Sequence, residues 1–442
     1  MKTLNKALSY SILSACVASP SFAGTQAKSF LNTYAELAGS SYQAALDDAK
    51  ALQIALQDFA AAPNAVALEY AKQAWLQSRE TYGVTEIFRL SGGPIDAEEG
   101  WVADTYGAPE GQLNAWPLDE NMIDYTTEAD GSVTSGNIID TAGIFNPGGE
   151  NAETVDVTSI TADALSTLNE NGGDANVATG YHAIEFLLWG QDQDYGNFTA
   201  DAVTPGALAA GARPLTDFTT DAHAARRLEF LDAAADLLVS DLDTVNSAWA
   251  KCEMKHGCKS DTKGAYRNAL LGQHYESSKN LDAEEAARTI LAGMGVFIKS
   301  ELANERIAVA VLTPSEEDEH SCFSDNTHRD ITLNYQGFIN VLKGELNGEK
   351  LGASLYDSAS SETQAKLDTL ISAIDARVNT MNELAESKMH FDYQIVDGAQ
   401  ANEIRRMKND MRKLGDVMVA VAADLSISLT EDDVTDAEET QI

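Results

Sequence analysis

Apolar residues spaced three and four positions apart recur over most of the chain, and this periodicity constrains its fold more than any other feature. In the run from 30 to 61 they form one such stripe, which ends at Pro63. Strand-like alternation is scarce, so the sequence predicts an all-α fold. Further helices are expected over residues 65–90, 177–190, 222–250, 263–281, 284–312, 331–346, 361–389 and 397–425.

The length of the chain, 442 residues, is too great for one small core and indicates two or three domain-sized units. The stretch 204–214, with two prolines and two glycines, is the predicted boundary. We therefore expect two helical bundles in tandem, over 24–210 and 211–428, followed by an acidic, disordered tail over 429–442. The irregular segment 91–176 inside the first bundle has the length of a functional loop.

The first 23 residues have the features of a signal peptide. Lys2 and Lys6 precede an apolar region, and small residues stand at 21 and 23, where signal peptidase requires them. This predicts export to the periplasm of a Gram-negative bacterium. The alternative is a membrane-anchored lipoprotein, because residues 13–16 resemble a lipobox in which Cys16 would carry the lipid.

The formal net charge of −39 excludes several classes of partner. Such an acidic surface repels DNA, RNA and anionic lipid headgroups, so we expect no nucleic-acid partner and no membrane contact beyond a Cys16 anchor. Solubility or adaptation to a saline medium is the competing explanation of the charge.

Three cysteines remain outside the leader. In an oxidising compartment Cys252 and Cys258 are predicted to form a disulfide that closes a short loop. A metal site made of these two cysteines and His256 is the alternative, but it lacks the fourth ligand that zinc normally takes. Cys322 is predicted to be a buried thiol.

His182 and Glu185 form the leading candidate pair, because they stand three residues apart within an apolar run and share one face of the predicted helix. Imidazole and carboxylate are both ligands of zinc and iron, and two of them leave open positions on the ion. Between Arg89 and Arg213, 123 residues contain 21 acids and no Lys or Arg, which favours cations. The competing interpretation is an ordinary hydrogen bond within the helix.

Several motifs in one order resemble the imelysin-like family, also described as the insulin-cleaving metalloproteinase family, and especially its branch called iron-regulated protein A. Residues 180–185 resemble the family's G-x-H-x-x-E signature. The resemblance covers about residues 30 to 425. The other motifs that carry it are residues 86–89, 93–96, 114–119, 293–295, 301–306 and 321–328.

The resemblance implies an envelope protein with two similar helical subdomains, a functional pocket between them and a link to iron uptake. It implies His182 and Glu185 as metal ligands. Three further acids, Glu86, Asp96 and Asp119, are candidates to complete a carboxylate-rich shell.

Five other residues are candidates to line the pocket. Arg89 could neutralise one of the acids, and Trp116 and Tyr181 could form apolar walls. Asp325 and His328 come from the other half of the chain, so they reach His182 only if the halves meet there.

Glu317 and His320 have the Glu-x-x-His spacing of carboxylate-bridged iron bundles. Only one copy is present, in a predicted loop, so a ferritin-like dinuclear site is not expected. His223, His256, His274 and His390 have no second ligand at a convincing spacing and are assigned no role.

Three functions remain open. The first is binding of iron, or of another divalent metal, followed by transfer to another envelope component of iron uptake. The second is a zinc-dependent peptidase with Glu185 as the base, although neither His-Glu-x-x-His nor His-x-x-Glu-His occurs in the chain. The third is binding of a small organic ligand between the subdomains. We expect a binding protein, because the ligand set of a zinc peptidase is incomplete.

Overall fold

The computed structural model describes residues 22–128, 130–191, 210–252, 259–312, 319–387 and 389–436. Residues 1–21, with most of the predicted signal peptide and Cys16, lie outside this range, as do Cys258 and Glu317. Cys252 is disulfide-bonded. Because Cys258 lies outside the described residues, the predicted pairing of these two cysteines stays a prediction. No helix of the described part is long and apolar enough to cross a membrane.

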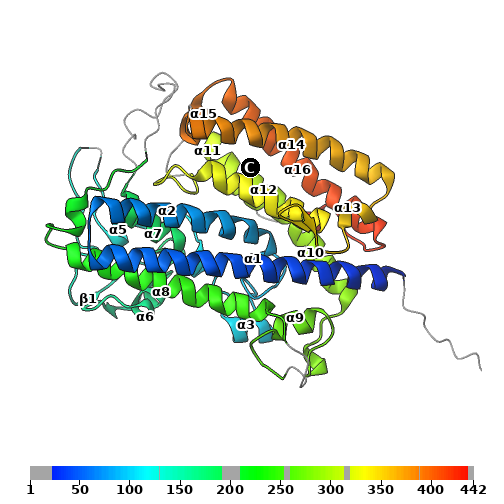
Figure 1. The fold of residues 1–442 in the computed structure, drawn as a ribbon, viewed down its shortest axis with the longest axis horizontal. Helices are drawn as coiled ribbons and strands as arrows, with labels where there is room; N and C mark the ends of the chain where they lie inside the picture. The colour runs from blue at the N-terminus through cyan, green and yellow to red at the C-terminus, as the bar shows by residue number, and fades with distance from the viewer. Residues whose placement is uncertain are drawn as a thin grey trace, which may run out of the picture.

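The all-α prediction is confirmed, and the first group of helices surrounds α1 (Phe22–Ala61). Helices α2 (Ala65–Tyr82) and α8 (Ala224–Trp249) both pack along α1, and α7 (Gly180–Trp189) packs against α2 and α8. Figure 1 shows α1 in blue along the length of this layer. The apolar stripe of α1 is buried in this bundle, as the three- and four-residue spacing predicts.

The second group of helices lies beside the first (Figure 1). Helix α10 (Ala283–Val296) continues through a π-helix, η6 (Phe297–Ala308), into α11 (Val309–Leu312). Helix α12 (Thr327–Lys343) packs against η6 and α14 (Ser361–Ser387). Helix α16 (Gln400–Asp424) packs against α14, η6 and α10.

Helix packing crosses the predicted boundary at 204–214. Helix α8 follows residue 211, yet it packs against α1 and α7 of the first group. Its apolar face is complementary to these helices, so the first bundle extends to about residue 250. Across the junction, η1 (Gly83–Phe88) packs against α12, and α1 contacts α10.

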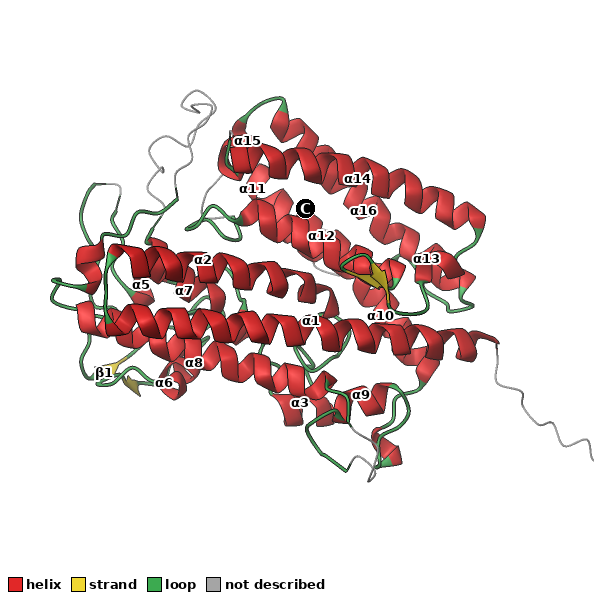
Figure 2. Cartoon of the chain, in the orientation of Figure 1, coloured by secondary structure: helices red, strands yellow, loops and turns green. Residues whose placement is uncertain are grey.

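The segment predicted as irregular, 91–176, contains short helices connected by turns. These helices are α3 (Gly100–Tyr106), α4 (Glu110–Leu113), α5 (Glu120–Ile123) and α6 (Ala162–Leu168). Only two-residue strands occur among the described residues, in two antiparallel hairpins (Figure 2). They are β1 (Ile144–Phe145) with β2 (Val155–Asp156), and β3 (Glu345–Leu346) with β4 (Glu349–Lys350).

The helix expected over 263–281 is shorter than predicted. Helix α9 (Ala265–Leu270) ends before Gly272, whose φ of +69° is incompatible with a continuing right-handed helix. A 3-10 turn, η5 (Ser277–Lys279), follows. The other short elements are η3 (Leu215–Phe218), α13 (Leu355–Ser358), α15 (Phe391–Val396) and η7 (Asp432–Val434).

The described part of the predicted acidic tail, residues 429–436, packs against α10. Val434 is fully buried, and a Cβ built on Gly295 would lie 2.5 Å from the Val434 Cβ. Arg288 Nη2 pairs with Asp433 at 2.6 Å. This differs from the expected solvated tail, because the buried Leu429 and Val434 side chains and polar contacts such as the Arg288–Asp433 pair hold an otherwise acidic segment in place.

Candidate functional site

The glycine that begins α7 is required by its surroundings. Gly180 has a φ of +78°, and a Cβ there would lie 2.4 Å from the carbonyl oxygen of Leu113. Only glycine combines this backbone conformation with so close an approach. The helix that follows is buried along its whole length, so both His182 and Glu185 have no exposed surface.

His182 and Glu185 bind each other within α7. The distance from His182 Nδ1 to Glu185 Oε2 is 3.0 Å. The other carboxyl oxygen, Glu185 Oε1, accepts hydrogen bonds from the Ser324 amide at 2.9 Å and the Ser324 hydroxyl at 2.7 Å. His182 Nε2 is buried without a hydrogen-bond partner among the described residues. Nε2 is therefore the atom of this pair that is left for a ligand.

Burial keeps both groups uncharged. It raises the pKa of Glu185 to about 8, and it lowers the pKa of His182 well below its usual value. At neutral pH the Glu185 carboxyl therefore carries a proton, which it donates to His182 Nδ1, and the imidazole proton resides on Nε2.

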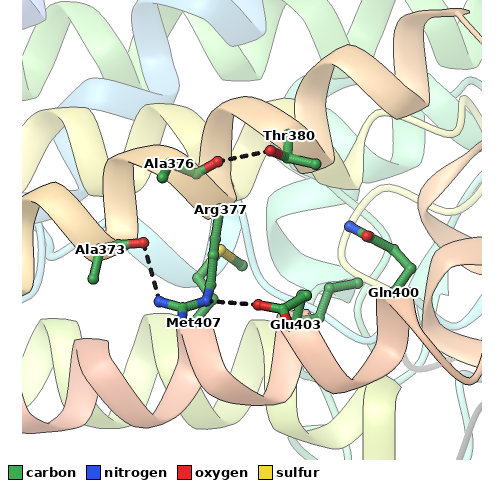
Figure 3. Close-up of a pocket in the computed structure, with 8 residues that line it drawn as sticks. Ala373, Ala376, Arg377, Thr380, Gln400, Glu403 and Met407 are labelled. Atoms are coloured by element: carbon green, nitrogen blue, oxygen red, sulfur yellow. Dashed lines mark hydrogen bonds and ion pairs between the residues drawn. The ribbon is translucent and has the colours of Figure 1, made fainter.

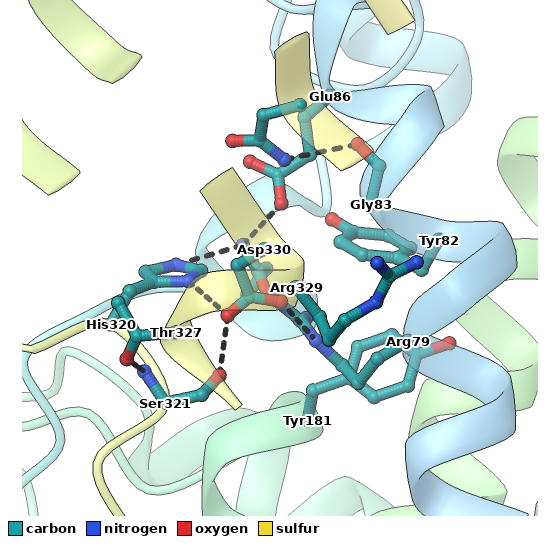
Figure 4. A network of polar contacts seen from close by, with 12 residues as sticks. Arg79, Tyr82, Gly83, Glu86, Tyr181, His320, Ser321, Thr327, Arg329 and Asp330 are labelled. Carbon is teal, nitrogen blue, oxygen red and sulfur yellow. Dashed lines mark hydrogen bonds and ion pairs between the residues drawn. The ribbon is translucent and has the colours of Figure 1, made fainter. Parts of the chain in front are cut away.

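A second histidine from the other half of the chain lies against the first. The rings of His182 and His320 meet edge to face with centroids 4.6 Å apart, and Trp116 lies 4.9 Å from His182. His320 Nδ1 is 2.8 Å from Asp330 Oδ2 (Figure 4). Burial, together with the charge of Arg306, lowers the pKa of His320, so this ring is also neutral.

Asp330 is the charged member of the site. Burial alone would raise its pKa, but the Arg79 guanidinium, 2.8 Å away, and the bond from His320 hold the pKa of Asp330 well below its usual value. Arg79 itself is fully buried and pairs with Asp330 (Figure 4). It also donates to Asn114 Oδ1. The site therefore combines a fixed ion pair with two neutral imidazoles.

The two histidines have the same type of support. Glu185 bonds His182 and accepts from the Ser324 hydroxyl, and Asp330 bonds His320 and accepts from the Ser321 hydroxyl. Both serines therefore donate to a carboxyl group. A nucleophilic serine instead donates to the imidazole that acts as its base, so this arrangement is not that of a serine hydrolase.

Glu86 and Arg89 lie at the edge of this site. Glu86 Oε1 accepts from Asn114 Nδ2 at 3.1 Å, and Glu86 Oε2 accepts from Arg306. Arg89 lies 3.8 Å from Glu86 and 3.1 Å from Glu301. Both carboxylate oxygens of Glu86 are thus engaged, and Asn114 separates Glu86 from His320.

Asp96 and Asp119 hold backbone turns. Asp96 accepts from the Leu90 amide, and burial raises its pKa to about 6. Asp119 accepts from the Met122 amide at 3.0 Å and caps α5. Among the described residues, no hydrogen bond or ion pair joins the Asp96 or Asp119 carboxylate to His182.

The predicted pocket residues separate into two groups. Trp116 contacts His182, whereas the Tyr181 hydroxyl bonds Ser78 at 2.8 Å and its ring lies under Arg79. Asp325 pairs with His390, and His328 Nδ1 donates to the Asp325 carbonyl at 3.1 Å. Tyr181 thus supports the ion pair, and Asp325 with His328 belongs to a separate cluster.

Hollows in the surface lie away from His182. One of about 310 Å³ lies between α14 and α16, where Arg377 is already paired with Glu403 (Figure 3). Another of about 510 Å³ lies at the junction of the bundles, lined by residues of α1, α12 and the β3–β4 hairpin. Trp116 and Tyr181 line neither hollow.

Sequence reasoning missed His320 and Asp330. In the sequence alone, His320 is one half of a single Glu-x-x-His in a predicted loop. The available signal was its position directly before the 321–328 motif, which also supplies Ser321 and Ser324. The folded chain brings this segment onto α7.

Comparisons with known proteins give one family and one fold. The family model described as imelysin matches residues 38–418. A solved structure from Parabacteroides distasonis ATCC 8503, named provisionally as an iron-regulated protein A precursor, is similar with a TM-score of 0.59 and 18% identity. The match covers 93% of this chain and 97% of that chain, and it shows a shared fold. No curated protein matches the chain.

Proposed function

The chain belongs to the imelysin family, and from this premise we propose that it is an exported metal-binding protein that takes part in iron uptake. The observation that carries the proposal is the pair of neutral, carboxyl-supported imidazoles, His182 and His320, one from each bundle. The name of the structural neighbour supports the link to iron.

The ligand atoms in this proposal are the Nε2 atoms of His182 and His320. In histidines that bind metals, the N–H of the other ring nitrogen usually donates a hydrogen bond to a carboxylate or carbonyl, which fixes the ring and its tautomer. Glu185 and Asp330 stand in that position for the two rings. Glu185 thereby acts as the support of His182, and its own oxygens stay with His182 and Ser324.

Binding at His182 requires a proton to leave. The Nε2 proton is released to solvent, and the Glu185 proton moves to Nδ1, so the pair becomes a carboxylate and a metal-bound imidazole. The negative charge then left on Glu185 offsets part of the charge of the ion. Affinity should therefore rise with pH.

Access to His182 needs movement at the junction. The histidine has no exposed surface, its ring contacts Trp116 and His320, and Phe323 packs against Trp116. We infer that an ion enters when the cover from the second bundle shifts away from α7. Such a movement would couple release of the ion to contact with another envelope component.

The peptidase alternative has weaker support in the geometry. A metallopeptidase needs a carboxylate that faces the metal-bound water. Both oxygens of Glu185 are engaged by His182 and Ser324. We therefore propose binding without turnover, in the periplasm or on a lipid anchor at Cys16.

The proposal is tested by metal content and titration. Protein purified from its own envelope should contain iron, and anaerobic titration with Fe²⁺ should show a site that weakens at least about 100-fold in His182→Ala and His320→Ala. His223→Ala is the matched control, since the side chain of this histidine is partly exposed and pairs with Asp140 at 3.6 Å. Unchanged affinity in both site variants, with folding intact, would refute the proposal.

A further inference from the structure

A second cluster of metal-ligating side chains lies in the second bundle. It consists of Asp325, His390 and Asp392, whose potential ligand atoms all lie within 4.8 Å of one another. Among the described residues, no other group of three or more His, Cys, Asp or Glu side chains converges in this way. We propose that these three residues form a second cation site for a divalent first-row transition ion such as Fe²⁺, Mn²⁺ or Zn²⁺.

The distances suit such an ion. Ligand atoms about 2.0–2.2 Å from a metal lie roughly 3 to 4 Å from one another. A contraction of less than about 1 Å from the observed spread would complete this arrangement. His390 Nδ1 and Asp325 Oδ2 are in direct contact, so these two atoms must move slightly apart to admit an ion between them.

The donor set selects the class of ion. Two carboxylates carry a charge that a divalent cation neutralises, and the imidazole favours transition ions over Mg²⁺ and Ca²⁺, which prefer oxygen ligands alone. Asp325 and Asp392 are buried, with exposed fractions of 4% and 3%. A divalent cation in this cluster would therefore be held by two buried carboxylates and one imidazole.

The backbone holds the three ligands in place. Asp325 has a φ of +57°, and its carbonyl accepts a hydrogen bond from His328. His390 and Asp392 flank the first residue of α15, and the Gln394 side chain ties this turn to the carbonyl oxygens of Met381 and Met389 at 3.0 Å each. The ligands therefore come from two segments that are each fixed independently.

The cluster is partly open to solvent through one side chain. The His390 ring retains 12% exposure, so an ion can reach it without opening the junction of the bundles. Asp325 directly follows Ser324, which bonds Glu185, so one turn carries contacts to both sites. The second site does not depend on the proposed function of the first.

The test is a titration of the full-length protein with Co²⁺, whose visible absorption reports imidazole and carboxylate ligation. We expect wild type to bind two equivalents, His182→Ala one, Asp392→Asn one, and the double variant none. At the second site, Asp392→Asn should weaken binding at least about 100-fold, because it removes a direct ligand. Glu383→Gln, an exposed acid on α14, is the matched control and should bind like wild type.

Circular dichroism and the thermal midpoint check that each variant folds, and His390→Gln replaces Asp392→Asn if the latter does not fold. Loss of one equivalent in Asp392→Asn alone, with none lost in His182→Ala, would support the second site while refuting the first. Full binding by folded Asp392→Asn and His390→Gln would overturn the second site, whatever His182→Ala shows.

Discussion

At the residue scale, burial decides which atoms of the central site can act. His182 and Glu185 have no exposed surface, and the protonated Glu185 and neutral His182 can exchange a proton along their 3.0 Å contact. Asp330 stays ionised in the same surroundings because Arg79 compensates it. Two carboxyl groups in one buried site thus differ in charge, one neutral and one ionised, and Arg79 is the largest cause of the difference, followed by the bond from His320.

Glu185→Gln should lower metal affinity about 10- to 100-fold without unfolding the protein. The amide oxygen must face the two Ser324 donors, so the NH₂ group faces His182 Nδ1 and forces the ring proton onto Nε2. That tautomer cannot bind a metal through Nε2. Fe²⁺ titration checks this, with Glu383→Gln as the control; equal affinities would show that His182 does not bind through Nε2.

Asp241→Asn should stabilise the protein at pH 8 and leave it unchanged near pH 4. Burial on α8 raises the pKa of Asp241 to about 7, so the folded state holds its proton more tightly than the unfolded state. The stability that this proton gives is present at low pH and is lost as the pH rises from about 4 to about 7.

One pKa unit corresponds to about 1.4 kcal/mol, and the partial exposure of Asp241 reduces the effect of its pKa shift. We therefore expect Asp241→Asn to raise the free energy of unfolding by about 2 kcal/mol at pH 8. Urea unfolding of wild type and Asp241→Asn near pH 4 and at pH 8 measures this difference in the free energy of unfolding. Identical pH dependence in wild type and Asp241→Asn would contradict the assignment.

At the scale of elements, a π-helix connects the bundles. In η6 the i→i+5 geometry brings Glu301 and Arg306 together at 3.3 Å. Arg306 reaches Glu86 of the first bundle, and Glu301 pairs with Arg89. An α-helix would place residues five apart on different faces, so this contact network depends on the π conformation.

Gly293→Ala should destabilise the protein by about 1–3 kcal/mol. A Cβ at Gly293 of α10 would lie 2.2 Å from the Leu90 carbonyl oxygen, and a backbone atom cannot move aside easily. Chemical unfolding measures the change. Gly398→Ala, where a Cβ meets no atom within 4 Å, is the control, and equal midpoints for the two variants would contradict this close packing.

At the scale of the whole molecule, the net charge of −39 opposes the compact state. Many acids have partners, yet the chain has 69 Asp and Glu against 30 Lys and Arg. Most of this excess must lie on the surface, where salt screens it.

NaCl should therefore raise the thermal midpoint by several degrees between about 10 mM and 300 mM, over which the Debye length falls from about 30 Å to below 10 Å. Differential scanning calorimetry measures the midpoint, and KCl should have the same effect if screening is the cause. A midpoint that falls with added NaCl would show that attractive ion pairs outweigh the repulsion.

The sequence alone predicts the all-α class and most long helices, because hydrophobic periodicity is a local property of the chain. It also singled out His182 and Glu185, since two residues three positions apart lie on the same face of a helix. Gly180 was visible as part of a motif, but the reason for a glycine at this position, the close Leu113 carbonyl, was not.

Only the tertiary structure decided which groups meet. His320 and Asp330 lie more than a hundred residues after His182, and no local pattern specifies their approach. The same holds for the placement of α8 in the first bundle and for the convergence of Asp325 with His390 and Asp392. These contacts arise because apolar faces must be buried against one another, and the polar groups beside those faces are then fixed by the packing.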